Sequence, residues 1–301
     1  MEFAFVNKQL AGRELQSSHY GTQPKIRPTP YVPAMKTLLI SLLLIALVLY
    51  MAGCGFLYFK QESLLFYPQK LPTTYQFRFP GEYREYPVTA PDGTRLSGLL
   101  FKAKAAKGLV FFLHGNGGSL AGWGSVAATY TRLGYDVFLL DYRGYGKSEG
   151  SISGQAQLLA DVEAAYNQLK AAYSESTIVI AGYSVGTGPA AWLAARHHPK
   201  RLLLHAPYYS LADMAAHTIR LWPILPGWLL RYPMPTNEFV QQVRAPVVLF
   251  HGDHDEIIPY QSSVRLQALL KPGDQLISIR GGRHNGLLEQ PQYQQVIGQV
   301  L

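Results

Sequence analysis

Short apolar runs recur along the chain from about residue 80, and polar or helix-like stretches separate them. Several runs are almost uninterrupted in their apolar character, as expected for strands that are buried on both faces. Six runs are predicted to be strands: Leu109–Leu113, Tyr135–Leu140, Thr177–Ala181, Arg201–His205, Pro246–Phe250 and Gln275–Arg280. Between them, Leu159, Val162, Tyr166 and Leu169 repeat at helical spacing, and Thr187–His198 also has a helix-like composition. This alternation predicts an α/β fold with a mostly parallel central sheet and helices on both faces.

Two alternating stretches precede this pattern. Tyr83–Val88 and Arg95–Phe101 flank the turn-forming residues Pro91-Asp92-Gly93 and predict a β-hairpin.

The region between Ser210 and Ala245 is less regular. Its stretch Leu221–Leu230 is apolar, contains two tryptophans and is interrupted by prolines, which predicts a small cap at about residues 210–245. Trp222 and Trp228 would then form a wall for acyl chains or contact a membrane surface; alternatively, they complete the core. Some 35 residues are too few for a large independent cap domain.

The N-terminal region contains a long apolar stretch. Thr37–Phe59 carries no charge over 23 residues, enough for a helix that spans a hydrocarbon core of about 30 Å. Positive charges precede this stretch, at Lys8, Arg13, Lys25, Arg27 and Lys36, and few follow it closely. The positive-inside rule then places the N-terminus in the cytoplasm and the following domain outside it. We therefore expect an N-terminal segment at 1–36, a transmembrane anchor or signal segment at 37–59, and one domain at 60–301.

The same stretch has a second interpretation. Met35-Lys36 and the apolar residues after it resemble a bacterial signal peptide, and Met51-Ala52-Gly53-Cys54 resembles a lipobox. Met35 would then be the true start, and Cys54 would be the lipidation site of an anchored lipoprotein. Continuation of the apolar run through Phe59 favours the signal anchor, and both alternatives tether the protein to a membrane.

Charge and cysteine content limit the remaining classes of function. The net charge is +8, but lysines and arginines are scattered along the chain, so we expect no nucleic-acid partner. A single cysteine excludes an intramolecular disulfide, and no metal-ligand spacing suggests a metal or another cofactor. The sequence leaves the oligomeric state open.

Candidate chemistry begins with the motif Gly182-Tyr183-Ser184-Val185-Gly186. It lies between a predicted strand and a predicted helix, so Ser184 is expected on a sharp, strained corner with its hydroxyl exposed. The two glycines are expected because a Cβ at either position would crowd the crossing backbones.

A serine hydroxyl needs a base, and the base needs an orienting acid. Candidates for both follow predicted strands: Asp253 or Asp255 after Pro246–Phe250, and His284 after Gln275–Arg280. Carboxyl ends of parallel strands meet at one edge of a sheet. The order serine, aspartate, histidine is that of α/β-hydrolases.

The strand at Leu109–Leu113 leads into His114-Gly115-Asn116-Gly117-Gly118. Small residues there let backbone N–H groups point at a developing oxyanion, and we expect the donors to be the N–H groups of Asn116 and Val185. His114 is expected to bond the loop. A phosphate-binding turn is disfavoured because the P-loop lysine is missing.

These motifs resemble a known family. The sequence is similar to serine hydrolases of the membrane-anchored Bem46/ABHD13/ABHD17-like group, over roughly residues 60 to 301. The matching segments are Leu64–Pro68, Phe112–Gly118, Asp141–Gly150, Gly182–Gly186, Asp255 with Pro259, and Gly282–Asn285. The resemblance implies the α/β-hydrolase fold and favours Asp255 over Asp253 as the acid.

The resemblance also leaves substrate contacts to be assigned. Tyr183 and His205 are candidate pocket residues, although His205 could instead be a satisfied buried imidazole. Arg143 and Lys147 could meet an anionic head group, but a rigid structural loop is the favoured interpretation of their segment.

The function expected from these features is a membrane-tethered serine hydrolase that cleaves carboxylic esters or thioesters through Ser184, His284 and Asp255. The substrate would be a small-molecule or lipid acyl ester. A serine peptidase or a lysophospholipase of the same fold is the enzymatic alternative, and a non-catalytic envelope scaffold is the other.

Overall fold

The computed structural model describes residues 31–218 and 225–301. The chain divides into two units, one ending at Tyr50 and one running from Met51 to Leu301. The division falls inside a helix, whereas the sequence suggested a boundary at residue 60. The second unit holds the predicted sheet and the candidate site residues that the structure describes.

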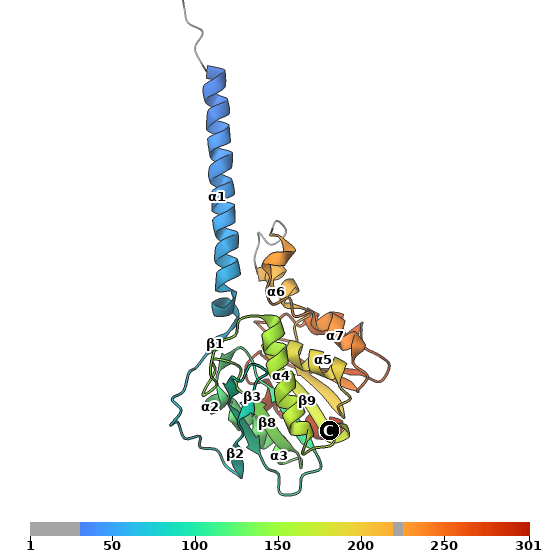
Figure 1. Cartoon of the computed structure of the whole chain (residues 1–301). Helices are drawn as coiled ribbons and strands as arrows, with labels where there is room; N and C mark the ends of the chain where they lie inside the picture. Colours follow the sequence, from blue (N-terminus) through green and yellow to red (C-terminus); the bar gives the residue numbers. More distant parts are fainter. Residues whose placement is uncertain (1–30, 219–224) are drawn as a thin grey trace, which may run out of the picture. The chain divides into compact units, whose positions relative to one another are not determined.

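A central sheet organises the second unit (Figure 1). Within the described residues it has eight strands, in the order β12-β11-β10-β9-β6-β8-β5-β2. The strands from β12 to β8 are parallel, while β5 and β2 are antiparallel to their neighbours. Their bounds are β2 Tyr83–Glu85, β5 Gly98–Phe101, β6 Leu109–Leu113, β8 Asp136–Leu140, β9 Ile178–Tyr183, β10 Arg201–His205, β11 Val247–Gly252 and β12 Gln275–Ile279. The predicted parallel sheet is therefore confirmed.

Helices cover both faces of this sheet, and adjacent strand residues point to opposite faces. Phe111 packs in one core cluster with residues of α4 (Gln155–Lys170), α5 (Thr187–Arg196), α7 (Thr236–Gln242) and α8 (Gln261–Gln267). Phe112 packs in the other, with α2 (Leu120–Trp123), α3 (Ala127–Thr131) and α9 (Pro291–Val300). The near-continuous apolar runs of the sequence follow from this burial on both faces.

Shorter elements complete the unit. The hairpin of β3 (Val88–Thr89) and β4 (Arg95–Leu96) is the predicted one, and Gly93 takes φ of 86° in its turn. A two-residue parallel pair joins β1 (Tyr67–Pro68) to β7 (Gly117–Gly118). Single 3-10 turns lie at η1 Gly124–Val126, η2 Glu175–Thr177, η3 Ser184–Gly186, η5 Gly227–Leu229 and η6 Leu287–Glu289.

The predicted cap region contains α6 (Leu211–Thr218), η5 and α7. Trp222 lies outside the described residues. Trp228 lies in η5 with 70% of its side chain exposed, and its ring is 6.5 Å from that of Tyr58.

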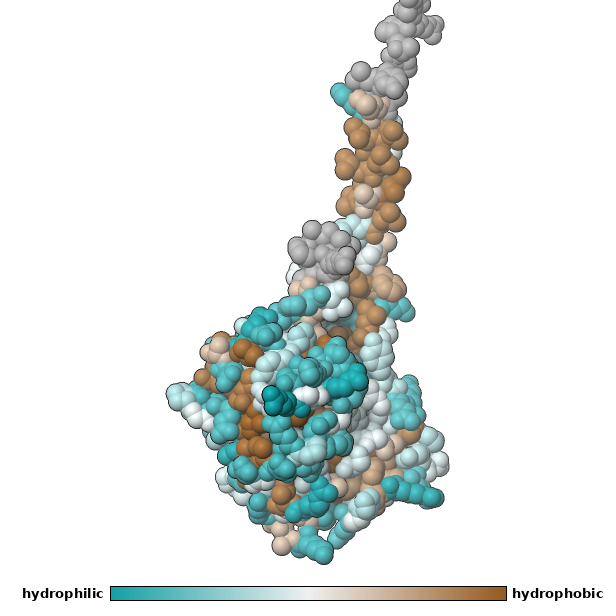
Figure 2. Space-filling view, turned by 180° about the vertical axis from the view of Figure 1, so that it is seen from behind, coloured by the Kyte–Doolittle hydropathy of each residue, from teal (hydrophilic) through white to brown (hydrophobic). Residues whose placement is uncertain are grey.

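The N-terminal apolar stretch forms helix α1 (Tyr31–Leu65). Among the described residues, the segment Met35–Leu65 of this helix is long and apolar enough, by length and composition, to cross a membrane. Hydrophobic side chains cover much of its length in Figure 2. The helix continues past Phe59, where the uncharged stretch ends, through Lys60, Gln61 and Glu62 to Leu65.

Candidate active site

Ser184 lies at the junction of β9 and α5, where the chain turns sharply. Its φ is 51°, a left-handed conformation that a residue with a Cβ rarely adopts. A Cβ on Gly182 would lie 2.5 Å from the Gly186 carbonyl oxygen, and one on Gly186 would lie 2.2 Å from that of Leu113. Both glycines are therefore required by the close approach of the strand, the turn and the neighbouring loop, as the motif predicts.

The sheet brings Ser184, His284 and Asp255 into one hydrogen-bonded chain. The Ser184 hydroxyl lies 3.0 Å from Nε2 of His284, and Nδ1 of that imidazole lies 2.8 Å from Oδ2 of Asp255. Asp255 follows β11, His284 follows β12, and Ser184 follows β9, so each occupies the carboxyl end of a parallel strand. Ser184 and His284 are 7% and 4% exposed.

The carboxylate of Asp255 is satisfied from several directions. Oδ1 accepts the backbone N–H groups of Ile257 and Ile258 at 2.9 and 2.8 Å. Oδ2 also lies 3.2 Å from Nε2 of a second imidazole, His251, which is fully buried. Burial alone would raise the pKa of the Asp255 carboxyl, but hydrogen bonds from His251 and His284 outweigh it and hold the pKa below its usual value.

Asp253, the competing acid, has a different position. Its Oδ1 accepts the backbone N–H of Gly281 at 2.6 Å, which ties the loop after β11 to the loop after β12. Its side chain is 38% exposed. Asp255 is the aspartate that meets His284.

The loop after β6 borders the serine. The Asn116 carbonyl accepts the backbone N–H of Tyr67 at 2.9 Å and the hydroxyl of Tyr145 at 2.6 Å, which fixes the loop from two sides. Nδ1 of His114 donates to the Gly115 carbonyl at 2.7 Å. The loop therefore presents Asn116 beside Ser184 and Val185.

His114 of this loop contacts a buried carboxyl group. Nε2 of His114 is 3.4 Å from Oδ1 of Asp141, and neither side chain is exposed. Burial raises the pKa of the Asp141 carboxyl above its usual value. Oδ1 of Asp141 also accepts the backbone N–H of Leu120 at 3.0 Å, so this buried pair connects the loop after β6 to the start of α2.

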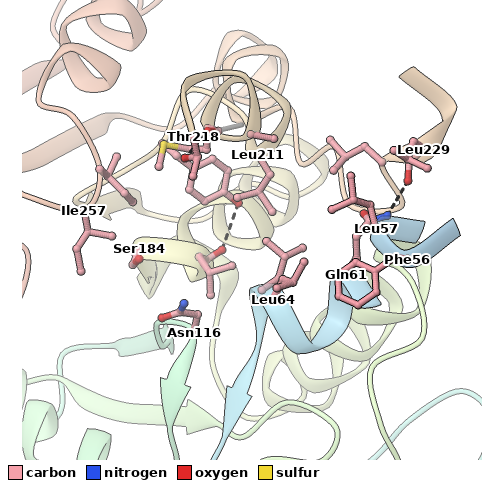
Figure 3. Close-up of a pocket in the computed structure, with 17 residues that line it drawn as sticks. Phe56, Leu57, Gln61, Leu64, Asn116, Ser184, Leu211, Thr218, Leu229 and Ile257 are labelled. Carbon is pink, nitrogen blue, oxygen red and sulfur yellow. Dashed lines mark hydrogen bonds between the residues drawn. The ribbon is translucent and has the colours of Figure 1, made fainter. Parts of the chain in front are cut away.

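An apolar cavity of about 560 Å³ opens onto Ser184. Asn116 and Ser184 lie at one end, near Ile257 (Figure 3), and Val185 and Ile258 also line the cavity. The remaining walls come from the base of α1 and from the cap residues around α6 and η5. A cavity of this size and character is typical of a small-molecule site.

Of the predicted pocket residues, the three that the structure describes, Tyr183, His205 and Trp228, do not line this cavity. His205 is fully buried and bonded to the Gly182 carbonyl and the Tyr293 hydroxyl, so of the two alternatives left open by the sequence these contacts favour the satisfied buried imidazole. Burial lowers the pKa of His205 to about 4. Tyr183 borders a smaller cavity of about 270 Å³, and its hydroxyl donates to the His284 carbonyl. Trp228 is not among the residues around either cavity.

The side chain of Arg143 is held in structural ion pairs. Its guanidinium bonds Asp161 at 2.6 Å and Asp92 at 2.6 Å, which joins the loop after β8 to α4 and to the hairpin turn. Lys147 pairs with Glu85 at 2.8 Å. These contacts favour the rigid-loop interpretation over contact with an anionic head group.

Residues 31–218 and 225–301 contain no group of three or more histidine, cysteine or carboxylate side chains that could hold a metal ion. Sequence reasoning missed two parts of the site: His251 and the base of α1. His251 stands in the same segment as Asp255, but only the fold turns its ring toward the carboxylate.

A parallel sheet with a serine on a strand-to-helix corner, followed by an aspartate and a histidine, is the architecture of an α/β-hydrolase. Known proteins agree. Residues 104–239 match a family model described as serine aminopeptidase, S33. An uncharacterized protein of Mycobacterium tuberculosis, MT2364, is 31% identical over 234 residues, which is 76% of this chain and 82% of that protein.

Two further similarities are informative. The alpha/beta hydrolase domain-containing protein 17C of Xenopus tropicalis is 29% identical over 64% of this chain and 61% of its own length. The Pyrococcus furiosus esterase Pf2001 shares the fold, with a TM-score of 0.62 at 20% identity over 78% of this chain and 96% of the esterase. The chain belongs to the α/β-hydrolase family, as a hydrolase of the ABHD-like type.

Proposed function

We propose that the protein is a membrane-tethered serine hydrolase that cleaves carboxylic esters or thioesters through a covalent acyl-enzyme. The observation that carries this proposal is the continuous hydrogen-bonded chain from the Asp255 carboxylate through His284 to the Ser184 hydroxyl. A strained corner under the serine and an apolar cavity at its hydroxyl support it further.

In the first half of the reaction, Oγ of Ser184 attacks the carbonyl carbon, and Nε2 of His284 takes the hydroxyl proton. Asp255 fixes the tautomer that carries a proton on Nδ1 and stabilises the imidazolium. The N–H groups of Asn116 and Val185 stabilise the oxyanion. The intermediate collapses, and His284 returns the proton to the departing alcohol or thiol.

In the second half, water attacks the acyl-enzyme carbonyl while His284 again accepts a proton. Collapse of this second intermediate releases a carboxylic acid and returns the proton to Ser184. Each proton that leaves Ser184 or water is delivered to a leaving oxygen or sulfur, so the cycle restores the enzyme.

A serine peptidase is the second candidate because the matching family model is described as a serine aminopeptidase. A lysophospholipase would use the same groups on a lipid ester. Competing these substrates against simple esters decides among them.

Helix α1 would supply the membrane tether. Its length and composition suit a single span, and the positive charges before it would keep the N-terminus in the cytoplasm and the catalytic unit outside. If Cys54, which is 4% exposed within α1, were instead a lipidated first residue, the mass of the mature chain would reveal it.

The test is pre-steady-state turnover of p-nitrophenyl acetate by the full-length protein, beside an aminoacyl p-nitroanilide. We expect a burst of p-nitrophenol with one equivalent per active site, and loss of turnover by about a thousandfold or more in Ser184→Ala. Ser176→Ala, at an exposed serine, is the control. Unchanged turnover in Ser184→Ala would overturn the mechanism, and preferred anilide cleavage would favour the peptidase.

A further inference from the structure

The cavity at Ser184 is an apolar slot whose lining suits a hydrocarbon chain. None of the described residues that line it is charged. Its polar side chains away from the serine are already satisfied: Tyr208 donates to the Val185 carbonyl at 3.2 Å, and Thr218 to the Met214 carbonyl at 2.9 Å. Away from the serine, a peptide in this cavity would leave its amide groups without side-chain partners, which costs free energy, whereas an alkyl chain would need none.

One wall of the slot is the base of helix α1. Phe56, Leu57, Gln61, Leu64 and Leu65 line the cavity at helical spacing. Figure 3 shows Phe56, Leu57, Gln61 and Leu64 across the cavity from Leu211 and Thr218 of α6. All five belong to the same unit as the catalytic residues, which begins at Met51.

Polar contacts hold this wall against the cap. The Gln61 carboxamide, 7% exposed, donates to the Leu229 carbonyl at 2.6 Å and accepts the Arg231 backbone N–H at 2.8 Å. The next residue, Glu62, pairs with the Arg231 guanidinium at 2.7 Å and accepts the Tyr232 hydroxyl at 2.7 Å. A side-chain amide that bonds a backbone N–H and C=O at once fixes both distance and orientation.

The chain leaving α1 is also joined to the oxyanion loop. The backbone N–H groups of Tyr67 and Gln69 donate to the carbonyls of Asn116 and Gly118, at 2.9 and 2.8 Å. The wall, the cap and the loop that would hold the oxyanion are therefore connected through residues 61–69.

The direction of proton transfer assigns the slot to the acyl side of the substrate. His284 must protonate the leaving group, so the leaving group lies on the side of the imidazole. The slot is lined by Ser184, Asn116 and Val185 but not by His284. The smaller cavity, by contrast, is lined by Tyr183 and by Asn285, which directly follows His284 in the chain.

We propose that the base of α1 is a wall of the active site, and that this wall selects substrates with a long, unbranched acyl chain. The chain lies between α1 and α6 with its carbonyl carbon at Ser184 and its alcohol or thiol directed toward His284. Helix α1 thus determines substrate choice as well as location. This inference rests on the proposed serine hydrolase function.

The test is a series of p-nitrophenyl esters from acetate to dodecanoate, cleaved by the full-length protein in lipid nanodiscs. Each methylene that becomes buried is expected to raise kcat/KM about fourfold, so burial of all six additional methylenes of octanoate would raise it about 4000-fold over acetate, and burial of four of them would already give more than about a hundredfold. Decyl acetate, which carries its long chain on the alcohol, should be a poor substrate compared with decanoate esters.

Two matched pairs of variants locate the wall. Leu57→Trp fills the slot from α1, and Ala215→Trp fills it from α6; both are expected to lower the octanoate-to-acetate ratio about tenfold or more. Their controls are Phe59→Trp and Ala216→Trp, at exposed neighbouring positions outside the cavity, which should keep the ratio of the unaltered protein.

Outcomes separate the two proposals. Labelling of Ser184 by a small fluorophosphonate identifies any variant that fails to fold, and the variant on the other helix then replaces it. Suppose that acetate is cleaved through Ser184 but the octanoate-to-acetate ratio is close to one, or is the same in the wall variants and their controls. The proposed role of α1 is then wrong, while the proposed hydrolase function is retained. A preference for decyl acetate would overturn the acyl assignment. If no ester is cleaved and Ser184 is unreactive, the proposed function fails as well.

Discussion

Asp255 interacts with two imidazoles, and His251 is the one outside the proposed triad. Nε2 of His251 faces two acceptors, Oδ2 of Asp255 at 3.2 Å and the Ile258 carbonyl at 3.0 Å, so this nitrogen must carry the proton. Its Nδ1 then accepts the hydroxyl of Ser263 at 2.7 Å. The ring therefore acts as a fixed donor that orients the carboxylate toward His284.

Replacing this donor should weaken catalysis more than it weakens the fold. We expect His251→Phe to lower kcat/KM per titrated active site by roughly 10- to 100-fold, because an unbalanced buried hydrogen bond costs about 1–3 kcal/mol. His251→Gln, which retains an N–H, should keep more activity. His254→Phe, at a side chain that is 75% exposed, is the control. Equal activity per titrated site in the His251 variants and the control would remove the positioning role.

At the residue scale, the sequence indicated which side chains belong to the proposed triad, but not which tertiary contacts each side chain makes. The positions of Ser184, Asp255 and His284 after three predicted strands were enough to expect them at one sheet edge. The sequence left the role of His205 open because a histidine at a strand end can point either to the edge or to the core. Its stacking 5.3 Å from Phe250 is a tertiary contact that periodicity does not encode.

At the scale of elements, helix α1 contains both the long apolar stretch of the sequence and residues that line the cavity at Ser184. Its uncharged stretch was visible in the sequence, but its extension to Leu65 was not, because the bonds that stabilise that end come from residues 229–232. Contacts between segments about 170 positions apart leave no local pattern. For the same reason the cap was predicted as a region, without its fastening to the helix.

If the Gln61 hydrogen bonds hold the cap against α1, their removal should increase the local opening of the cap. Gln61→Leu keeps the size of the side chain but removes both of its hydrogen bonds, which leaves the backbone N–H of Arg231 without that acceptor. Amide exchange at Arg231 should accelerate about tenfold, corresponding to about 1.4 kcal/mol. Ser63→Ala, at an exposed position on the same turn, should leave the exchange rate unchanged. Equal protection in Gln61→Leu would mean that the cap is held by other contacts.

At the scale of the whole molecule, the buried His205 makes the stability of the fold depend on pH. Its pKa is about 4 in the folded protein, against about 6.5 for a solvated histidine. The folded state therefore binds fewer protons than the unfolded state between these values. The associated stability is fully present above about pH 6.5 and is lost as the pH falls toward 4, to a total on the order of 3 kcal/mol.

Thermal unfolding of the full-length protein at several pH values between 7.5 and 4 tests this linkage. The midpoint should fall across that interval, and the fall should be smaller in His205→Phe, which keeps the aromatic packing but cannot titrate. Asp255, whose carboxyl pKa is held below its usual value, would lose its contribution only at lower pH, below about 3.9. Parallel curves for the two proteins would contradict the role of His205.

The reactivity of Ser184 tests the central claim most directly. Full-length protein is treated with a fluorophosphonate, and the modified residue is mapped by mass spectrometry alongside Ser184→Ala and His284→Ala. The account predicts a single adduct on Ser184, no adduct in Ser184→Ala, and labelling slowed by about a hundredfold or more in His284→Ala. A folded protein whose Ser184 stays unmodified, or reacts equally fast without the imidazole, would contradict it.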